Sequence, residues 1–166
     1  MNPDFSDLLK LFNGNHVKYL IVGGYAVAYH SEPRYTKDLD LWIEATPENA
    51  ALVFQALRQF GAPLKGLAPL DFTQEGYVYS VGIPPVRVDV LMSLSGITFE
   101  DAWNTRVESE FGGEPTQFIS REHLLRAKRA SGRPQDLMDA SALETAEKIV
   151  DRLSEPAGNG DGEREP

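Results

Sequence analysis

The segment between residues 20 and 41 constrains the fold of this chain more than any other. An apolar run that ends at Val22 is typical of a buried strand, and it is followed at once by Gly23-Gly24 and a short helix ending at His30. A glycine pair lets another group approach the backbone closely, and the first N–H groups of a helix are free to bind an anion. The segment therefore predicts a strand–turn–helix unit suited to phosphate, although a simple tight turn also explains the two glycines.

Two acidic residues, Asp38 and Asp40, lie on the next predicted strand, residues 38–44. Period-two alternation sends both carboxylates to one face of the strand and the intervening leucines to the other, into the core. Neighbouring carboxylates repel one another, and a cation that takes oxygen ligands removes this repulsion. Mg²⁺ suits the pair because it binds a few carboxylates together with substrate phosphates and water. The other interpretation is a solvated strand end that carries two exposed acids.

A third acid, Asp89, lies on a later predicted strand, residues 86–91, with its apolar neighbours on the opposite face. If the two strands are adjacent, Asp89 lies beside Asp38 and Asp40. Three carboxylates can hold two metal ions that clamp the attacking and leaving oxygens of a phosphoryl displacement. The third acid can also accept the proton of the nucleophile. Taken alone, Asp89 also fits an ordinary exposed acid.

Together these features resemble the signature of the DNA polymerase beta-like nucleotidyltransferase superfamily. That signature is a hydrophobic strand, a Gly-Gly or Gly-Ser pair, a spacer, two acids in an alternating Asp-hydrophobic pattern, and a third Asp on a later strand. The matching residues, within a resemblance that covers residues 17–91, are Ile21-Val22-Gly23-Gly24, Asp38-Leu39-Asp40-Leu41 and Val88-Asp89-Val90. The run Arg34-x-Thr36-x-Asp38-Leu39-Asp40-Leu41 is similar to the AbiEii-type branch, many of whose members are toxins of bacterial toxin–antitoxin or phage-abortive systems.

The C-terminal third extends this resemblance. A helix predicted over residues 120–130 carries Lys128, and Pro134 opens a last helix that runs to about residue 153. Residues 133–139 are similar to the AbiEii-type pattern Arg-x-Lys-Asp-x-x-Asp, except that Gln135 replaces the Lys. The second motif implied by this likeness consists of Arg133, Asp136 and Asp139. An acid in the first turn of a helix is also what the helix dipole favours, so Asp136 has a structural explanation as well.

The resemblance implies a role for each matching residue in transfer of a nucleoside monophosphate from an NTP to an acceptor hydroxyl. The metal-binding and catalytic residues are Asp38, Asp40 and Asp89, which imply two Mg²⁺ ions. Asp89 completes the site and activates the nucleophile. The implied nucleotide-binding residues are Gly23, Gly24, Arg34, Thr36 and Lys128, with the glycines cradling the triphosphate and Lys128 neutralising it. For Arg34, a salt bridge fits the sequence equally well.

The charge balance bears on possible partners. The chain has 16 Lys and Arg residues against 25 Asp and Glu residues, a net charge of -9, which argues against general DNA binding. Residues 121–133 nevertheless hold five basic residues against one acidic residue. Such a cluster suits a triphosphate or an RNA backbone, and it also fits a solvated helix face. The resemblance implies an NTP as substrate, and its AbiEii-type branch implies a tRNA or protein as acceptor and an antitoxin protein as a further partner.

Other global features set the class of protein. The chain has no cysteine, no apolar run near the roughly 18 residues that a spanning helix needs, and no basic segment followed by an apolar core at its start. These features predict a cytoplasmic protein without a membrane partner. The pattern of elements predicts an α+β chain, and the resemblance implies a minimal nucleotidyltransferase fold. Residues 1–119 are expected to form the core, residues 120–153 a helical extension packed on it, and residues 154–166 a disordered tail.

The sequence leaves two alternatives open. One is the same chemistry with a small acceptor, as in an antibiotic-type adenylyltransferase. The other is a non-catalytic nucleotide-binding or regulatory module that keeps the fold, against which the complete set of three acids argues.

Overall fold

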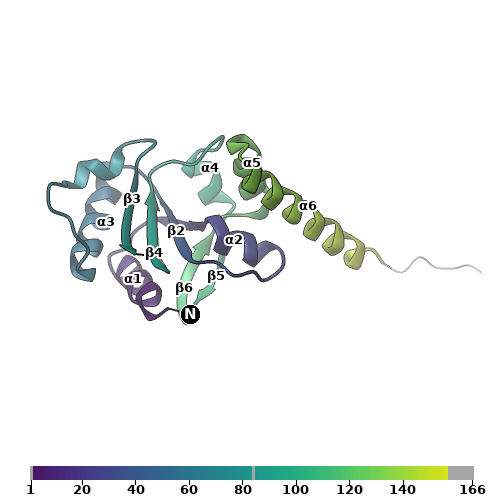
Figure 1. The fold of residues 1–166 in the computed structure, drawn as a ribbon, viewed down its shortest axis with the longest axis horizontal. Coiled ribbons are helices and arrows are strands. Elements are labelled where there is room, and N and C mark those ends of the chain that lie inside the picture. Colours follow the sequence, from purple (N-terminus) through teal and green to yellow (C-terminus); the bar gives the residue numbers. More distant parts are fainter. Residues whose placement is uncertain (1, 84, 157–166) are drawn as a thin grey trace, which may run out of the picture.

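A single mixed sheet forms the centre of the molecule (Figure 1). The computed structural model describes residues 2–83 and 85–156 of the chain. Six strands follow the order β3-β4-β2-β1-β6-β5. They are β1 (Tyr19–Val22), β2 (Asp38–Ile43), β3 (Val78–Ile83), β4 (Val86–Leu91), β5 (Val107–Phe111) and β6 (Glu114–Phe118). With its flanking helices this sheet confirms the predicted α+β class.

Several of the helices begin or end at a capping residue. They are α1 (Pro3–Gly14), α2 (Gly23–His30), α3 (Pro47–Phe60), α4 (Phe99–Asn104), α5 (Arg121–Ser131) and α6 (Pro134–Ser154). Ser120 begins α5 by accepting a hydrogen bond from the backbone N–H of His123. Gly132 ends α5 in the left-handed conformation, and Pro134 opens α6. A short 3₁₀ helix, η1 (Pro69–Thr73), overlaps the end of a segment for which the sequence predicts only a loop over residues 61–70.

The core lies on the face of β2 opposite its acids. Leu39, Leu41 and Ile43 are fully buried there, as the period-two pattern predicts. In Figure 1, α1 and α3 lie on one side of the sheet and α2, α4 and α5 on the other. Farther along the acidic face of β2, Trp42 packs edge-to-face on Phe99 of α4. The acids therefore lie at the end of the strand that α4 leaves uncovered.

Strand pairing brings distant parts of the sequence together. β2 runs antiparallel to β1 and parallel to β4. A parallel pair needs a long crossover, and here the connection contains α3, η1 and β3. The register places Asp40 directly opposite Asp89. The strand adjacency that the predicted site needs is therefore present.

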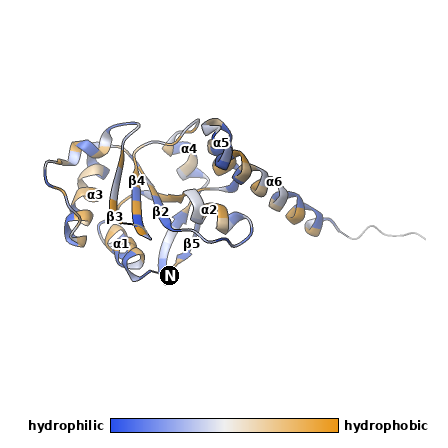
Figure 2. Ribbon diagram, viewed as in Figure 1, coloured by the Kyte–Doolittle hydropathy of each residue, from blue (hydrophilic) through white to orange (hydrophobic). Residues whose placement is uncertain are grey.

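The last helix, α6, packs beside α5 and then projects away from the sheet (Figure 1). Along its length, hydrophobic and hydrophilic residues alternate in bands (Figure 2). Within residues 2–83 and 85–156, none of the helices has the length and apolar character needed to cross a membrane. The predicted tail falls mostly on residues 157–166, which lie outside the described residues, and the division of the chain after residue 119 stays a prediction.

Candidate active site

The three acids predicted from the sequence lie together on β2 and β4. In the parallel register, Asp40 pairs with Asp89, and Asp38 pairs with Arg87. Residues opposite one another on paired strands point to the same face of the sheet, so one face presents all three carboxylates and one guanidinium. Of these four charged residues, only Arg87 was not identified from the sequence. Its place two residues before Asp89, on the same strand face, is the signal that could have found it.

Arg87 partly neutralises the acids. Its Nη2 lies 3.2 Å from Asp38 Oδ2 and 3.0 Å from Asp89 Oδ2. Ser80 on β3 donates a further hydrogen bond of 2.6 Å to Asp89 Oδ1. Arg87 thus forms ion pairs with Asp38 and Asp89 but not with Asp40. Asp89 is held in place from two directions.

Asp40 is the least compensated member of the group. Burial, and then the charges of Asp89 and Asp38, raise the pKa of Asp40 from 3.8 to about 7, against the opposing effects of Lys128 and Arg87. A carboxylate in this position gains from any cation that enters the site. The electrostatics of Asp40 therefore favour a bound positive charge beside it.

The donor atoms suit a hard divalent cation such as Mg²⁺, because they are carboxylate oxygens. Among the described residues, Asp38 Oδ1 is buried and has no hydrogen-bond partner, which leaves it free to coordinate. In the same part of the chain, no group of three or more His, Asp or Glu side chains has an arrangement that could hold a metal ion as it stands. Arg87 lies between two of the three acids, so the carboxylates can converge on one cation only if this side chain moves.

Close contacts with neighbouring side chains explain why glycine is needed at positions 23 and 24, and the sequence alone does not show these contacts. Gly23 begins α2 with a φ of 66°, and a Cβ at this position would overlap Asp40 Oδ2. A Cβ on Gly24 would lie 2.6 Å from Thr36 Cγ2. The residue before the helix, Val22, provides no side-chain cap. Because Gly23 has no side chain, the start of α2 lies directly against Asp40. With no side-chain cap, the first N–H groups of α2 are available to an anion.

Beside the acids lies a network of buried ion pairs. Lys128 Nζ on α5 is 3.2 Å from Asp136 Oδ1 and 3.1 Å from Asp139 Oδ2. Asp139, only 2% exposed, also pairs with Arg34 and accepts a 3.2 Å hydrogen bond from Gln135. Arg34 therefore reaches from the segment before β2 to α6. The salt bridge that the sequence left open as an alternative for Arg34 is present, with a partner more than 100 residues away, and its nucleotide-binding role stays a prediction.

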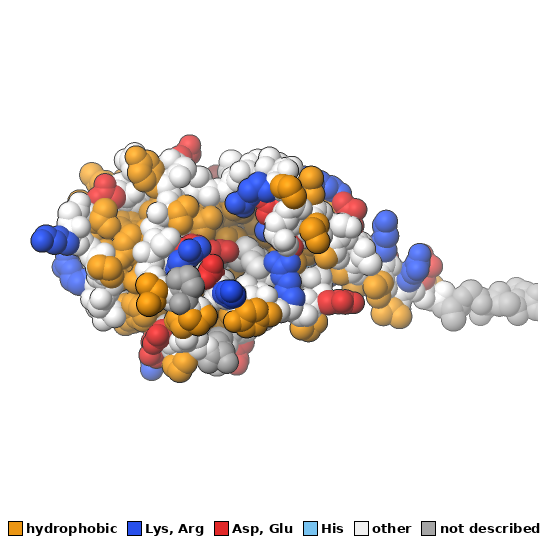
Figure 3. Space-filling model, viewed as in Figure 1, with side chains coloured by type: hydrophobic (Ala, Val, Ile, Leu, Met, Phe, Trp, Pro, Cys, Tyr) orange, Lys and Arg blue, Asp and Glu red, His pale blue; other side chains and the backbone are white. Residues whose placement is uncertain are grey.

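The basic stretch over residues 121–133 is largely neutralised within the fold. Arg133 lies 2.7 Å from Asp136, Arg126 pairs with Glu122, and Arg129 pairs with Glu144. On the face shown in Figure 3, acidic and basic side chains lie next to one another rather than forming a continuous basic surface. The excess of positive charge in this stretch is therefore not a free basic surface.

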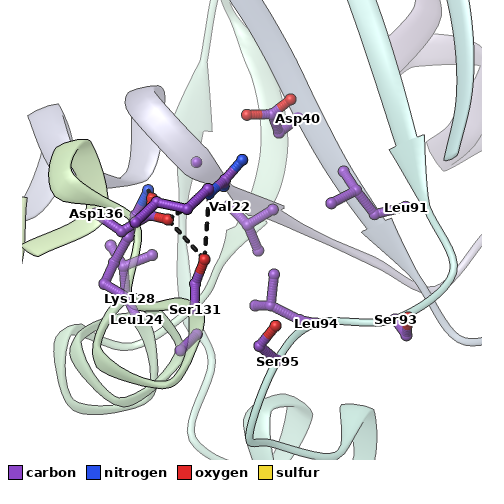
Figure 4. A pocket seen from close by; sticks show the side chains of 13 residues that line it. Val22, Asp40, Leu91, Ser93, Leu94, Ser95, Leu124, Lys128, Ser131 and Asp136 are labelled. Carbon is purple, nitrogen blue, oxygen red and sulfur yellow. Dashed lines mark hydrogen bonds and ion pairs between the residues drawn. The ribbon is translucent and has the colours of Figure 1, made fainter. Parts of the chain in front are cut away.

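A pocket of about 210 Å³ connects the acids to α5 (Figure 4). Of the predicted site residues, the structure places Gly23, Asp40, Lys128, Arg133 and Asp136 in its lining. The other predicted residues, Gly24, Arg34, Thr36, Asp38, Asp89 and Asp139, are not part of the lining.

The rest of the pocket wall was not predicted from the sequence. Apolar side chains of Val22, Leu91, Leu94 and Leu124 and the hydroxyls of Ser93, Ser95 and Ser131 line it. Ser93 and Ser95 continue the odd-numbered alternation of Asp89 past the end of β4, which is the signal that could have found them.

Asp136 makes a pH-dependent contribution to stability that can be measured. Burial alone raises the pKa of this carboxyl, but hydrogen bonds from Ser131, Arg133 and Lys128 outweigh it and lower the pKa from 3.8 to about 2. A lowered pKa in the folded state stabilises the protein above pH 3.8, and this stabilisation is lost as the pH falls towards 2. We expect Asp136→Asn to have a lower free energy of unfolding than wild type at pH 7. At pH 2 we expect this difference between the variant and wild type to be smaller.

Urea unfolding at a series of pH values checks this expectation. Asp151→Asn, which changes an exposed acid on the same helix, is the matched control. A destabilisation by Asp136→Asn that is equal at pH 7 and pH 2 contradicts the assignment.

The chain resembles known proteins in its fold rather than in its sequence. No protein-family model matches the chain, and no curated protein matches it. Among solved structures, it is similar to the lincosamide antibiotic adenylyltransferase LnuA bound to lincomycin, with a TM-score of 0.56 and 17% identity over 88% of this chain and 98% of LnuA. It is also similar to ANT(2")-Ia in complex with adenylyl-2"-tobramycin, with a TM-score of 0.56 and 15% identity over 90% of this chain and 91% of that one.

A third similar structure is an antigenic nucleotidyltransferase-like protein from Paracoccidioides brasiliensis, with a TM-score of 0.51 and 20% identity over 86% of this chain and 72% of that one. At these identities the likeness concerns the fold. This chain, with its six-stranded mixed sheet and flanking helices, therefore shares the overall fold of these nucleotidyltransferase structures.

Proposed function

We propose that this protein is a Mg²⁺-dependent nucleotidyltransferase that transfers a nucleoside monophosphate from an NTP to an acceptor hydroxyl and releases pyrophosphate. The observation that carries the proposal is the register of β2 and β4, which sets Asp40 against Asp89 beside the uncapped start of α2. The same arrangement combines a place for cations with a place for phosphates. The shared fold with nucleotidyltransferases supports it.

Each residue has a physical role in this reaction. Asp38, Asp40 and Asp89 would hold the two Mg²⁺ ions, whose charge offsets the negative charge that develops on the reacting phosphate. The free N–H groups at Gly23 and Gly24 bind phosphate oxygens. Asp89, held in place by Ser80, accepts the proton of the acceptor hydroxyl.

Lys128 on α5 lines the same pocket as Gly23 and Asp40, and it binds the triphosphate from the α5 side. Asp136 and Asp139 hold its ammonium group on two sides, so that little rotamer entropy remains to be lost when a phosphate arrives. With Arg34 and Arg133, this network has three cations and two carboxylates, and therefore a net charge of +1. Thr36, whose buried Oγ1 has no hydrogen-bond partner among the described residues, lies beside Gly24 and adds a donor at the start of α2.

The pocket takes the nucleoside end of the NTP. At about 210 Å³ it is smaller than the roughly 300 Å³ or more of a site that encloses a whole ligand, so it can hold only part of the nucleotide. Its inner wall, with Leu94 and Leu124 next to the hydroxyls of Ser95 and Ser131, offers apolar contact and hydrogen bonds to an uncharged group. The triphosphate then extends past Asp40 and Lys128 at the charged side of the pocket.

Two classes of acceptor fit this chemistry. The resemblance to the AbiEii-type branch favours a toxin that modifies tRNA or a protein and is paired with an antitoxin. A small acceptor, as for an antibiotic-type adenylyltransferase, is favoured by the likeness to LnuA and ANT(2")-Ia and by the internal neutralisation of the basic stretch.

Transfer of label from an NTP tests the proposal. The protein is incubated with Mg²⁺ and one of the four NTPs, which is labelled at either the α- or the γ-phosphate. Separate arms contain total tRNA, a protein extract, or lincosamide and aminoglycoside antibiotics as acceptors. We expect transfer of the α-label with pyrophosphate release in one arm, and no transfer when EDTA is present. Transfer of the γ-label instead indicates a kinase, and NTP binding without transfer in any arm indicates a non-catalytic module; either result rejects the proposal.

A further inference from the structure

Arg87 occupies an unusual position for a surface arginine. A single atom, Nη2, contacts both Asp38 and Asp89, at 3.2 Å and 3.0 Å. The backbone produces this placement, because Arg87 is the register partner of Asp38 on β2 and lies two residues before Asp89 on β4. One guanidinium nitrogen therefore lies where a cation shared by these two carboxylates would lie.

The guanidinium is held only by these acids. Its side chain is 38% exposed, and Arg87 Nε has no hydrogen-bond partner among the described residues. Arginine anchors a carboxylate most firmly through two parallel hydrogen bonds, and here one nitrogen is divided between two carboxylates. The position opposite on β3 is Gly82, which presents no side chain on this face. Although Nε itself is buried, Asp38 and Asp89 are the polar partners that hold the guanidinium among the described residues.

We propose that Arg87 is a displaceable counter-ion of the acidic site, which neutralises Asp38 and Asp89 until a divalent cation binds there and moves the guanidinium aside. This inference rests on the proposed function, because it takes the three acids as the cation site. A guanidinium and a divalent cation placed against the same two carboxylates repel one another, so the two compete for this position. Arg87 is thus a positioning residue that lowers the affinity for a cation arriving without nucleotide and keeps the acids from repelling one another.

Mn²⁺ binding in the absence of nucleotide tests this competition. Free and bound Mn²⁺ are measured by electron paramagnetic resonance for the full-length wild type and for Arg87→Met, with Arg58→Met as the control. Arg58 lies on α3 over the ring of Phe54, far from the acids in sequence, and its substitution removes the same charge. We expect Arg87→Met to bind Mn²⁺ about 5-fold more tightly than wild type, the equivalent of a modest ion pair, and Arg58→Met to bind it as wild type does.

Thermal unfolding gives a second readout that does not depend on activity. Without metal, Arg87→Met should unfold at a lower temperature than wild type because its acids lack their counter-ion. Saturating Mn²⁺ should raise its unfolding temperature by more than it raises that of wild type. If Arg87→Met does not fold, Arg87→Lys is used, because an ammonium group on a shorter side chain bridges the two acids less well and should also bind Mn²⁺ more tightly.

The results separate this inference from the proposed function. Equal or weaker Mn²⁺ binding by the folded variant overturns the role of Arg87, even if wild type transfers nucleotides. Absence of Mn²⁺ binding to either protein overturns it as well. Tighter binding by the variant supports the role of Arg87, even if wild type transfers no label in any arm.

Discussion

Asp40→Asn should reduce nucleotidyl transfer by at least about 100-fold, the usual effect of removing one group that stabilises charge in a transition state. The amide keeps the shape of the side chain but loses the negative charge that faces Asp89 across the paired strands. Initial rates of α-label transfer at saturating Mg²⁺ measure the effect. Asp151→Asn, which changes an exposed acid on α6, should keep the wild-type rate. Activity within threefold of wild type in Asp40→Asn would falsify the assignment of Asp40.

The same variant should be more stable than wild type at pH 8, which distinguishes lost chemistry from lost folding. In the folded state, the pKa of Asp40 is raised from 3.8 to about 7. Because the folded state favours the protonated carboxyl of Asp40, this carboxyl stabilises wild type fully below pH 3.8. The stabilisation is lost as the pH rises through 7. The amide in Asp40→Asn does not titrate, so the free energy of unfolding of this variant should not fall over this range. Urea unfolding between pH 4 and pH 8, without metal, measures the difference.

Gly23→Ala should reduce nucleotidyl transfer by about 100-fold, as expected when a catalytic group moves by about 1 Å. A Cβ at this position would overlap Asp40 Oδ2, so that either the carboxylate or the start of α2 must shift. The φ of 66° adds a backbone cost of roughly 1–2 kcal/mol for any residue with a Cβ. The rate of transfer and the free energy of unfolding are both measured.

Gly61→Ala separates these two costs. Gly61 ends α3 with a φ of 88°, and a Cβ there meets no atom within 4 Å. The two substitutions should therefore share the backbone cost of roughly 1–2 kcal/mol, while only Gly23→Ala loses activity. A similar loss of activity in both variants indicates that stability, rather than the contact with Asp40, is responsible.

Much of this fold could be predicted from the sequence because the local signals agree with one another. Val22 ends β1 before the glycine pair of α2, Pro134 opens α6, and the alternation of Asp38 to Ile43 separates the acids of β2 from the core. Each of these signals depends on neighbours in the chain. The class of fold, the elements and the faces of the strands follow from such local rules.

The site depended on contacts between distant segments, and the sequence does not encode these in any local pattern. Asp40 and Asp89 become neighbours only because β2 and β4 pair in parallel, and the same register brings Arg87 against Asp38. Lys128 was predicted to meet phosphates, yet the acids that hold it come from the next helix after a turn at Gly132. Net charge over a stretch likewise could not show that its cations are paired within the fold.

The ion pair between Arg34 and Asp139 means that the candidate site can be assembled only after α6 has been synthesised. The three carboxylates come before residue 90, whereas Lys128 and Asp139, the partner of Arg34, come after residue 120. A nascent chain that has not yet released α6 holds the acids without the opposing lysine or its buried partners. The geometry proposed for catalysis is therefore complete only once α6 has been synthesised and has packed beside α5.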